Sequence, residues 1–300
     1  MPVNQTNIPK QSLDALFLGG GTLINRDPLY LSIFRNTPAS SVFVFGTGVC
    51  SPEFWQRRPG WIDHMRDWVT CLRLSEFIGV RGPYSKQRLI KAGIRNRQIQ
   101  IIGDPALSLA RSGVWAKRLR KHIGINIGTA YGNLWGTDIE VCGFIITACF
   151  ELIKRGWDIT FVPVWPADVP CIERAAKMIS SPSVSIFRQF DSIKATMDIL
   201  ESMDVFIGQK LHSVVLAMCV YTPSIMLEYR PKCLDFMASM GLEAFNMRTD
   251  ALSVDRLLQL VGELYNNTLF YQRALRRGVV HYAQEQRKYA NEITRRLYNY

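Results

Sequence analysis

The six-residue segment 208–213, with the sequence GQKLHS, places a lysine and a histidine two residues apart. It follows an apolar strand predicted over residues 205–207 and opens a short helix predicted over 212–219. A helix that begins at this point directs backbone N–H groups and its positive end toward the end of the strand. Lys210 adds a cation, and His212 can exchange a proton near neutral pH. The segment is predicted to bind an anion and to perform acid–base chemistry, with Leu211 and Ser213 as further substrate contacts.

The next strand in the sequence is predicted over residues 224–227, and charged residues follow it closely. Glu228 and Lys232 lie just past its end, where they can reach the same ligand. Simple surface exposure is the alternative for both. The three other histidines are predicted to be structural: His64, His122 and His281.

Two glycine-rich turns follow predicted strands in the first third of the chain. Residues 19–22, GGGT, follow a strand predicted over 15–18, and residues 46–48, GTG, follow one over 42–45. Such turns let the backbone approach a ligand and offer N–H donors to an anion, although tight turns alone also use glycine. Neither matches a dinucleotide-binding or Walker pattern. The candidate ligand-binding residues are Gly20, Gly21, Thr22, Gly46 and Thr47.

Three further candidates follow strands of the same predicted sheet. Arg81 ends a strand over residues 77–80, and its guanidinium can bind a phosphate or carboxylate through two parallel hydrogen bonds. Ser85 is either a ligand contact or the cap of a helix predicted over 84–92. Asp104 follows a strand over 99–102 and either binds the ligand or organises the turn.

The chain alternates strand, loop and helix, which predicts parallel sheets covered by helices. A second series of strands is predicted over residues 123–127, 159–164 and 184–187, before those already named. Its helices are predicted over 138–155, 169–179, 192–203 and 232–240. A basic stretch, 111–122, reads as a linker between the two series. We predict two Rossmann-like domains, similar to the GT-B arrangement: a shortened domain over 1–118 and a second over 119–252. The helices over 253–300 are expected to pack across both. Such sheets bind ligands at the carboxyl ends of their strands.

Composition fits a globular protein of 300 residues, with 48% hydrophobic and 20% charged residues. The apolar runs are far shorter than the ~20 residues that cross a bilayer, and no secretory signal is evident. A cytoplasmic protein is expected. The seven cysteines form no C-x-x-C pair, so neither a zinc site nor a disulfide framework is predicted. No metal and no cofactor are expected.

The net charge of +11 predicts an anionic partner. Part of the excess lies from Arg273 to the chain end, with seven basic residues against Glu285 and Glu292. A solvated basic helix and an anionic membrane surface are both consistent with this stretch, and we prefer peripheral contact with a membrane. No nucleic-acid-binding motif is found.

Taken in order, these segments resemble the polysaccharide pyruvyltransferase family. The matching pieces are LFLGGGTLI, FGTGV, VRGPYS, IGDPAL and DVFIGQKLHSVVLA, followed by Tyr229 and Lys232. The resemblance implies a GT-B-like transferase that moves pyruvate from phosphoenolpyruvate to two sugar hydroxyls, giving a cyclic ketal. It also implies that Arg81 and the segment from Lys210 to His212 hold phosphoenolpyruvate. The acceptor would be a cell-surface glycan or its lipid-linked precursor.

Two features depart from the family pattern. Lys210 stands where the family usually has arginine, and a strand–helix stretch with an Asn-x-Gly-Asp turn does not precede the triple glycine. Two other readings therefore stay open. One is a GT-B glycosyltransferase that uses a nucleotide sugar, and the other is a glycan-binding relative without catalysis.

Overall fold

The computed structural model describes residue 8, residues 11–112 and residues 120–298, which divide into two compact units. Unit 1 runs to residue 108 and takes in residues from 281 onward, and unit 2 is residues 109–280. The division lies at 108/109. The boundary predicted from the sequence, 118/119, falls outside the described residues. The C-terminal helices form no third part, because the last helix belongs to unit 2 up to residue 280 and to unit 1 beyond it.

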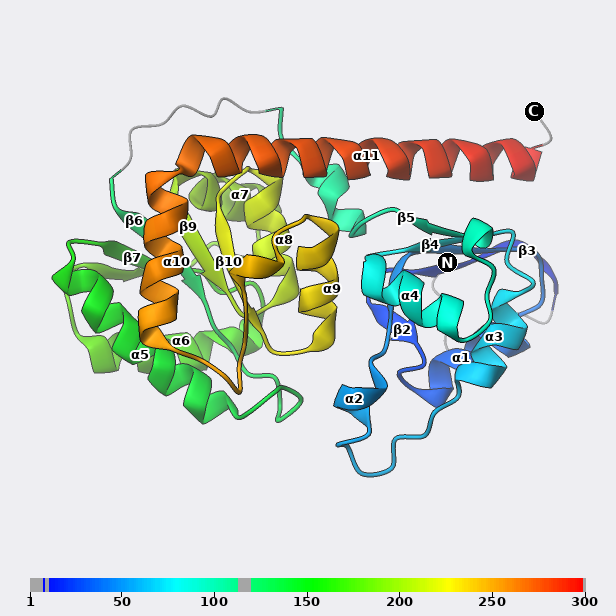
Figure 1. Cartoon of the computed structure of the whole chain (residues 1–300), viewed down its shortest axis with the longest axis horizontal. Coiled ribbons are helices and arrows are strands. Elements are labelled where there is room, and N and C mark those ends of the chain that lie inside the picture. Colours follow the sequence, from blue (N-terminus) through cyan, green and yellow to red (C-terminus); the bar gives the residue numbers. More distant parts are fainter. Residues whose placement is uncertain (1–7, 9–10, 113–119, 299–300) are drawn as a thin grey trace. The chain divides into compact units, whose positions relative to one another are not determined.

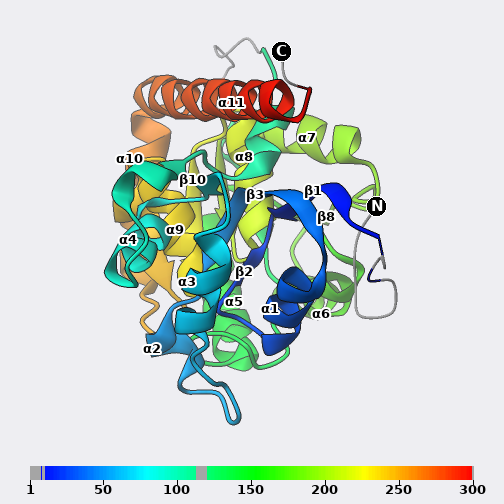
Figure 2. The same cartoon turned by 90° about the vertical axis from the view of Figure 1, so that its right-hand side faces the viewer.

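Unit 1 is built on a five-stranded parallel sheet. Its order is β1-β3-β4-β5, with β2 pairing beside β3. The strands are β1 (Leu13–Gly19), β2 (Thr22–Ile24), β3 (Ala39–Val49), β4 (Phe77–Val80) and β5 (Ile99–Ile101). The helices between them are α1 (Pro28–Asn36), α2 (Pro52–Trp55), α3 (Met65–Leu72) and α4 (Pro83–Lys91). Figure 2 shows α1 and α3 as neighbours, in agreement with their contacts.

Both faces of this sheet are packed. Leu16, Leu18 and Val44 join the helix residues Trp68 and Leu89 in one core cluster. A second cluster forms where the end of α11 (Thr268–Tyr298) meets Phe43 and Ile102 through Tyr289 and Ile293. Within it, the Tyr289 hydroxyl donates to the Val44 carbonyl at 2.8 Å and accepts from the Gly79 N–H at 3.1 Å. The part of α11 from residue 281 onward is therefore an integral part of unit 1.

Unit 2 contains a six-stranded parallel sheet with the order β11-β10-β9-β6-β7-β8. Its strands are β6 (His122–Asn126), β7 (Asp158–Phe161), β8 (Val184–Ile186), β9 (Val205–Gly208), β10 (Ser224–Glu228) and β11 (Asn246–Arg248). Its helices are α5 (Asp138–Lys154), α6 (Val169–Ile179), α7 (Ile193–Ser202), α8 (Leu211–Cys219), α9 (Pro231–Ser239) and α10 (Val254–Asn266), followed by the start of α11. Figure 1 shows α5 and α6 side by side, as their packing requires.

The strand order of unit 2 reverses between β6 and β9. The chain builds outward from β6 through β7 to β8, then returns to β9 and builds the other way through β10 to β11. Ligands of open α/β sheets bind outside the carboxyl ends of the strands at such a point. The ends of β6 and β9 are therefore the first place to seek a site.

The predicted fold class, an α/β protein with two parallel sheets and a helical C-terminus, is confirmed. Most predicted strands and helices of unit 2 lie within two or three residues of the observed ones. The sequence analysis did not predict α1, α2, α3 and the three-residue strands β2 and β11.

Candidate functional site

At the reversal point of unit 2, Asn126 ties the ends of three strands together. Its side-chain oxygen accepts the backbone N–H of Lys210 at 3.0 Å, and its amide donates to the Val162 carbonyl at 2.9 Å. Its backbone carbonyl accepts the N–H of Gln209 at 3.0 Å, and the Gln209 side chain in turn accepts the N–H of Gly128 at 2.8 Å. The first residues after β6 and β9 are therefore fixed relative to each other before any ligand binds.

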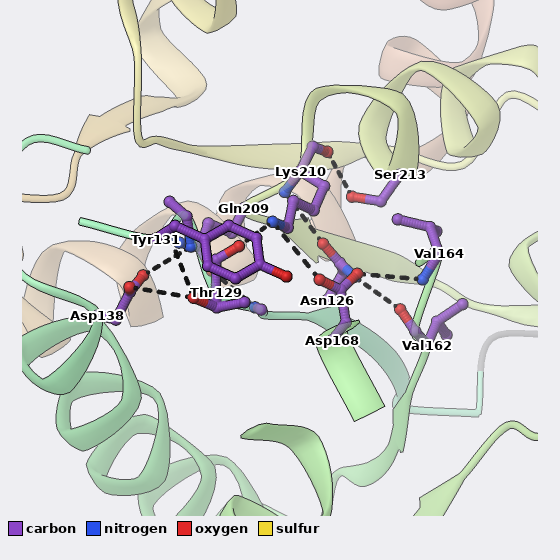
Figure 3. Close-up of polar contacts among 12 residues, drawn as sticks. Asn126, Thr129, Tyr131, Asp138, Val162, Val164, Asp168, Gln209, Lys210 and Ser213 are labelled. Atoms are coloured by element: carbon purple, nitrogen blue, oxygen red, sulfur yellow. Dashed lines mark hydrogen bonds and ion pairs between the residues drawn. The ribbon is translucent and has the colours of Figure 1, made fainter. Parts of the chain in front are cut away.

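Lys210 lies at the centre of this network, and the dashed lines in Figure 3 trace its contacts. Its ammonium donates to the Thr129 carbonyl and lies 3.5 Å from the Asp168 carboxylate. The same ammonium lies 5.8 Å from the centre of the Tyr229 ring. About a fifth of the side chain (19%) is exposed. A positive charge is thus held in one place and still open to solvent.

Asp168 is the anionic partner of Lys210 and is fully buried. Burial raises the pKa of its carboxyl above the ordinary range, while Lys210, the Val164 N–H and the Asn126 amide act in the opposite direction. Gly128 packs so closely that an added Cβ would lie 1.8 Å from the Asp168 oxygen. Asp168 and Asn126 were not predicted as site residues. The sequence does contain a signal for both, because each is a polar residue at or after the carboxyl end of a predicted strand, Asn126 at β6 and Asp168 after β7.

The loop from β6 to α5 is held by Asp138, the first residue of α5. Its carboxylate accepts the Ala130 N–H at 3.0 Å and the Thr129 hydroxyl at 3.4 Å. Thr137 and Glu140 cap the helix reciprocally, since each side chain bonds the other's backbone N–H. The Thr129 carbonyl that meets Lys210 is therefore fixed from behind by the first turn of α5.

The residues of the predicted segment at the start of α8 differ in burial: Leu211 and Ser213 are buried, Lys210 is partly exposed and His212 is exposed. Lys210 is the N-cap residue, and its side chain does not cap the helix. His212 is exposed on the first turn, whereas Leu211 is buried in the core and Ser213 is buried with its hydroxyl donating to the Lys210 carbonyl at 2.6 Å. Leu211 and Ser213 thus support the turn with their side chains, and His212 presents its imidazole outward. Their roles toward substrate stay predictions.

Glu228 and Lys232, predicted beyond β10, differ sharply in environment. Glu228 is 3% exposed and accepts hydrogen bonds from Trp135 Nε1 at 3.3 Å and Asn246 Nδ2 at 2.6 Å. Its pKa is raised because burial outweighs these two donors. The Lys232 ammonium lies 5.0 Å from the Tyr229 ring centre, so Lys232 and Lys210 both contact Tyr229.

In unit 1, the predicted residues converge on Arg81. Its guanidinium lies 2.9 Å from the Asp104 carboxylate, donates to the Gly21 carbonyl at 2.5 Å and approaches the Thr22 hydroxyl at 3.4 Å. Only 1% of Arg81 is exposed. The backbone N–H of Arg81 donates to the backbone carbonyl of Thr47. The hydroxyl of Thr47 in turn accepts the backbone N–H of Leu23 at 3.3 Å. Arg81 therefore holds the glycine turn and β3 together, and direct binding of a substrate by its guanidinium stays a prediction.

The remaining candidates of unit 1 shape turns or hold neighbouring strands through their own contacts. Gly20 and Gly46 have positive φ angles of 66° and 68°, and a Cβ on Gly46 would lie 2.3 Å from Pro105. The Asp104 carboxylate also accepts the Ala106 N–H at 3.0 Å, so it organises its turn. The suggested cap role of Ser85 is wrong: Gly82 is the N-cap of α4, and the buried Ser85 hydroxyl accepts the Val49 N–H at 2.9 Å.

The described part of the chain offers neither a metal site nor a membrane-spanning helix. Among those residues, no three His, Cys, Asp or Glu side chains gather in a way that could hold a metal ion. None of the helices in the described ranges is both long and apolar enough to span a membrane.

Comparison with known proteins adds the family. A family model described as polysaccharide pyruvyl transferase matches residues 3–231. Comparison with curated protein sequences gives no match.

Several solved structures share the fold. A UDP-GlcNAc 2-epimerase from Methanocaldococcus jannaschii, in complex with UDP-GlcNAc and UDP, is 16% identical with a TM-score of 0.56, over 84% of this chain and 69% of that one. A putative UDP-N-acetylglucosamine 2-epimerase from Listeria monocytogenes is 12% identical with a TM-score of 0.58, over 88% and 69%. The glycotransferase of kitacinnamycin is 16% identical with a TM-score of 0.54, over 95% and 76%. At these identities the likeness shows the fold alone, and it agrees with the GT-B-like class predicted from the sequence.

Proposed function

Because the chain belongs to the polysaccharide pyruvyl transferase family, we propose that it transfers pyruvate from phosphoenolpyruvate to two hydroxyls of one sugar, forming a cyclic ketal. The family is one of transferases, with a pyruvate donor and a glycan acceptor in general terms. We further propose that the donor is phosphoenolpyruvate and that the acceptor is a cell-surface glycan or its precursor. The proposal rests chiefly on the turn between β9 and α8, where Lys210 and His212 adjoin the reversal point of the sheet.

This turn suits a donor that carries a phosphate and a carboxylate close together. The N-terminus of α8 supplies a positive helix end, and the Lys210 ammonium supplies a full charge 3.5 Å from its buried counterion. Lys232 brings a second ammonium to within 5.0 Å of the centre of the same Tyr229 ring. Lysine binds an anion as a point charge and lacks the bidentate fork of arginine, so geometry around Lys210 has to come from its fixed partners.

The chemistry requires one group that gives and takes protons. Protonation of the methylene carbon of phosphoenolpyruvate makes the neighbouring carbon electrophilic. One sugar hydroxyl adds to that carbon, the C–O bond to phosphate breaks, and the second hydroxyl closes the ring as both hydroxyl protons leave. His212 is exposed at the helix start, and histidine is the side chain that most often serves as general acid and base in enzymes.

In this proposal Arg81 acts within unit 1. It holds the carbonyl of Gly21 and the hydroxyl of Thr22 in place, and so shapes the glycine turn for the acceptor. A cytoplasmic location with peripheral contact to anionic membrane also remains a proposal. Flotation of the protein with anionic but not neutral liposomes is the result expected for it.

A nucleotide-sugar transferase is the second candidate, because the fold is shared with enzymes solved in complex with UDP-GlcNAc. Calorimetric titration of the protein with phosphoenolpyruvate and with a panel of nucleotide sugars separates the two. Saturable binding of phosphoenolpyruvate alone supports pyruvyl transfer. Binding of a nucleotide sugar alone supports a nucleotide-sugar transferase instead. Binding of neither ligand favours a glycan-binding relative without catalysis.

A further inference from the structure

Two large aromatic side chains are exposed on the loops next to the Lys210 site. Tyr131, on the loop after β6, is 73% exposed, and Trp165, on the loop after β7, is 61% exposed. β6 and β7 are paired neighbours in the parallel sheet, so both loops leave the same edge. Within the described part of the chain, neither side chain makes a hydrogen bond or a ring contact. Two aromatic surfaces are therefore open to a ligand at the edge of the sheet that carries the candidate site.

Both loops contact the Lys210 ammonium through residues close to the aromatic ones. The Thr129 carbonyl accepts a hydrogen bond from the ammonium, and Tyr131 follows two residues later. The Asp168 carboxylate lies 3.5 Å from the same ammonium, three residues after Trp165. Figure 3 shows Tyr131, Thr129 and Lys210 in one group. The aromatic residues therefore belong to the surroundings of the cation that the proposed donor site uses.

The backbone of Tyr131 is held in a conformation that its side chain disfavours. Its φ angle of 50° lies in the left-handed region, which is rare for a bulky residue. The Tyr131 N–H donates to the Thr129 hydroxyl at 3.0 Å, and the Tyr131 carbonyl accepts the Asn133 side-chain amide at 3.2 Å. The Thr129 hydroxyl in turn donates to the Asp138 carboxylate at 3.4 Å. Strained backbone of this kind clusters where ligands bind, so the position of Tyr131 points to a function.

Trp165 is fixed in a different way, by a proline and by Asp168. Pro166 follows Trp165 and restricts its backbone to the extended region, where its φ is −146° and its ψ is 141°. The Trp165 carbonyl accepts the Asp168 N–H at 2.9 Å, and the Asp168 carboxylate accepts the N–H of the preceding Val164 at 3.4 Å. An exposed ring on a fixed backbone binds a ligand with a small loss of conformational entropy.

We propose that Tyr131 and Trp165 bind the acceptor in unit 2 by stacking on its pyranose rings. The C–H face of a pyranose is apolar, and contact with an aromatic ring removes this face from water, while the hydroxyls at its edge stay free to react. This inference rests on the proposed function, because the reacting hydroxyls must lie beside a donor held at Lys210. The substrate class is a glycan whose reacting pyranose has an open C–H face.

Saturation-transfer NMR of the whole protein with the methyl pyranosides of glucose, galactose and mannose tests the stacking. We expect wild type to saturate the ring C–H protons of at least one of them. The signal should fall about threefold or more in Trp165→Ala and in Tyr131→Ala, and Trp165→Phe should retain most of it. The control is Phe270→Ala, at an α11 residue of similar exposure (63%), which should match wild type.

Three results overturn the proposal. The first is the same signal in wild type, Trp165→Ala and Tyr131→Ala, and the second is no signal from wild type with any of the pyranosides. The third is saturation of uridine alone, which would assign the two rings to a nucleobase.

Calorimetric titration with phosphoenolpyruvate separates this inference from the proposed function. Trp165→Ala should bind phosphoenolpyruvate as wild type does, because Lys210 is held by the Thr129 backbone and by Asp168 rather than by the ring. Lost phosphoenolpyruvate affinity in Trp165→Ala with intact pyranoside binding would overturn the assignment to the acceptor. If wild type binds a pyranoside through the two rings but binds no phosphoenolpyruvate, the proposed function fails and the sugar subsite stands.

Discussion

Arg81 and Lys210 are both cations at the ends of strands, yet their surroundings give them different tasks. Arg81 is enclosed with Asp104, and Lys210 is partly open beside Asp168. A sequence pattern identifies the position of a charge at a strand end. It does not reveal whether a neighbouring carboxylate neutralises that charge. Asp104 lies 23 residues from Arg81 and Asp168 lies 42 residues from Lys210 in the sequence, and only the fold brings each pair together.

Replacement of Arg81 tests its structural task. Arg81→Ala leaves the Asp104 carboxylate buried without its counterion, which should lower the free energy of unfolding by about 3–5 kcal/mol. Urea denaturation measures the change, and Arg97→Ala, at an exposed arginine, should change it by no more than about 0.5 kcal/mol. Equal stability of the two variants would show that Arg81 does not hold unit 1 together and would favour direct substrate binding.

Glu228 provides a pH-dependent test. Its pKa in the folded protein is raised above 4.5, so the folded state keeps its proton to a higher pH than the unfolded chain does. As pH rises between the unfolded and the folded pKa, the contribution of Glu228 to the free energy of unfolding therefore falls. Glu228→Gln does not titrate. The unfolding free energy of this variant should therefore increase relative to wild type with rising pH, by at most about 1.4 kcal/mol per pH unit.

Urea unfolding of both proteins between pH 4 and pH 8 measures the difference. Glu243→Gln, at an exposed glutamate, is the control and should show no such slope. A difference between wild type and Glu228→Gln that stays constant with pH would contradict the raised pKa.

At the scale of elements, the turn from β6 to α5 and the start of α6 pack tightly behind Lys210. Gly128→Ala places a Cβ 1.8 Å from the Asp168 oxygen, so either the turn or Asp168 must move. We expect a loss of about 1–3 kcal/mol in unfolding free energy and weaker phosphoenolpyruvate binding. Gly143→Ala, in α5 with no atom within 4 Å of its Cβ, should instead stabilise by about 0.5–1 kcal/mol. A Gly128→Ala protein with wild-type stability and affinity would refute this packing.

The elements also show how far sequence reasoning reaches. Predicted and observed bounds agree at β4 and α6, because an apolar run or helical spacing between clear breaks marks them. α1 was missed although Asp27 caps it by accepting the Leu29 N–H at 2.9 Å and Pro28 opens it. β2 and β11 are three residues long, so their strand character comes from pairing with β3 and β10, which no local pattern records.

At the scale of the whole molecule, several basic side chains of α11 are held in ion pairs, and Glu76 is one acidic partner that lies far from α11 in the sequence. In α11, Lys288 pairs with Glu285, Arg295 with Glu292, and Arg296 with both Glu292 and Glu76. Such exposed pairs contribute little stability, but they reduce the charge available to a membrane. The basic helix is therefore a weaker argument for membrane contact than the residue count alone.

Donor binding at the start of α8 is the central step of the proposed function. The direct measurement is calorimetric titration of phosphoenolpyruvate into wild type, His212→Ala and His281→Ala, the last a control at another exposed histidine. We predict saturable binding by wild type and by His281→Ala, and at least tenfold weaker binding by His212→Ala, a loss of about 1.4 kcal/mol. Thermal unfolding of the three proteins verifies that each one is folded before it is titrated. Equal affinity of wild type and His212→Ala for phosphoenolpyruvate would contradict the account.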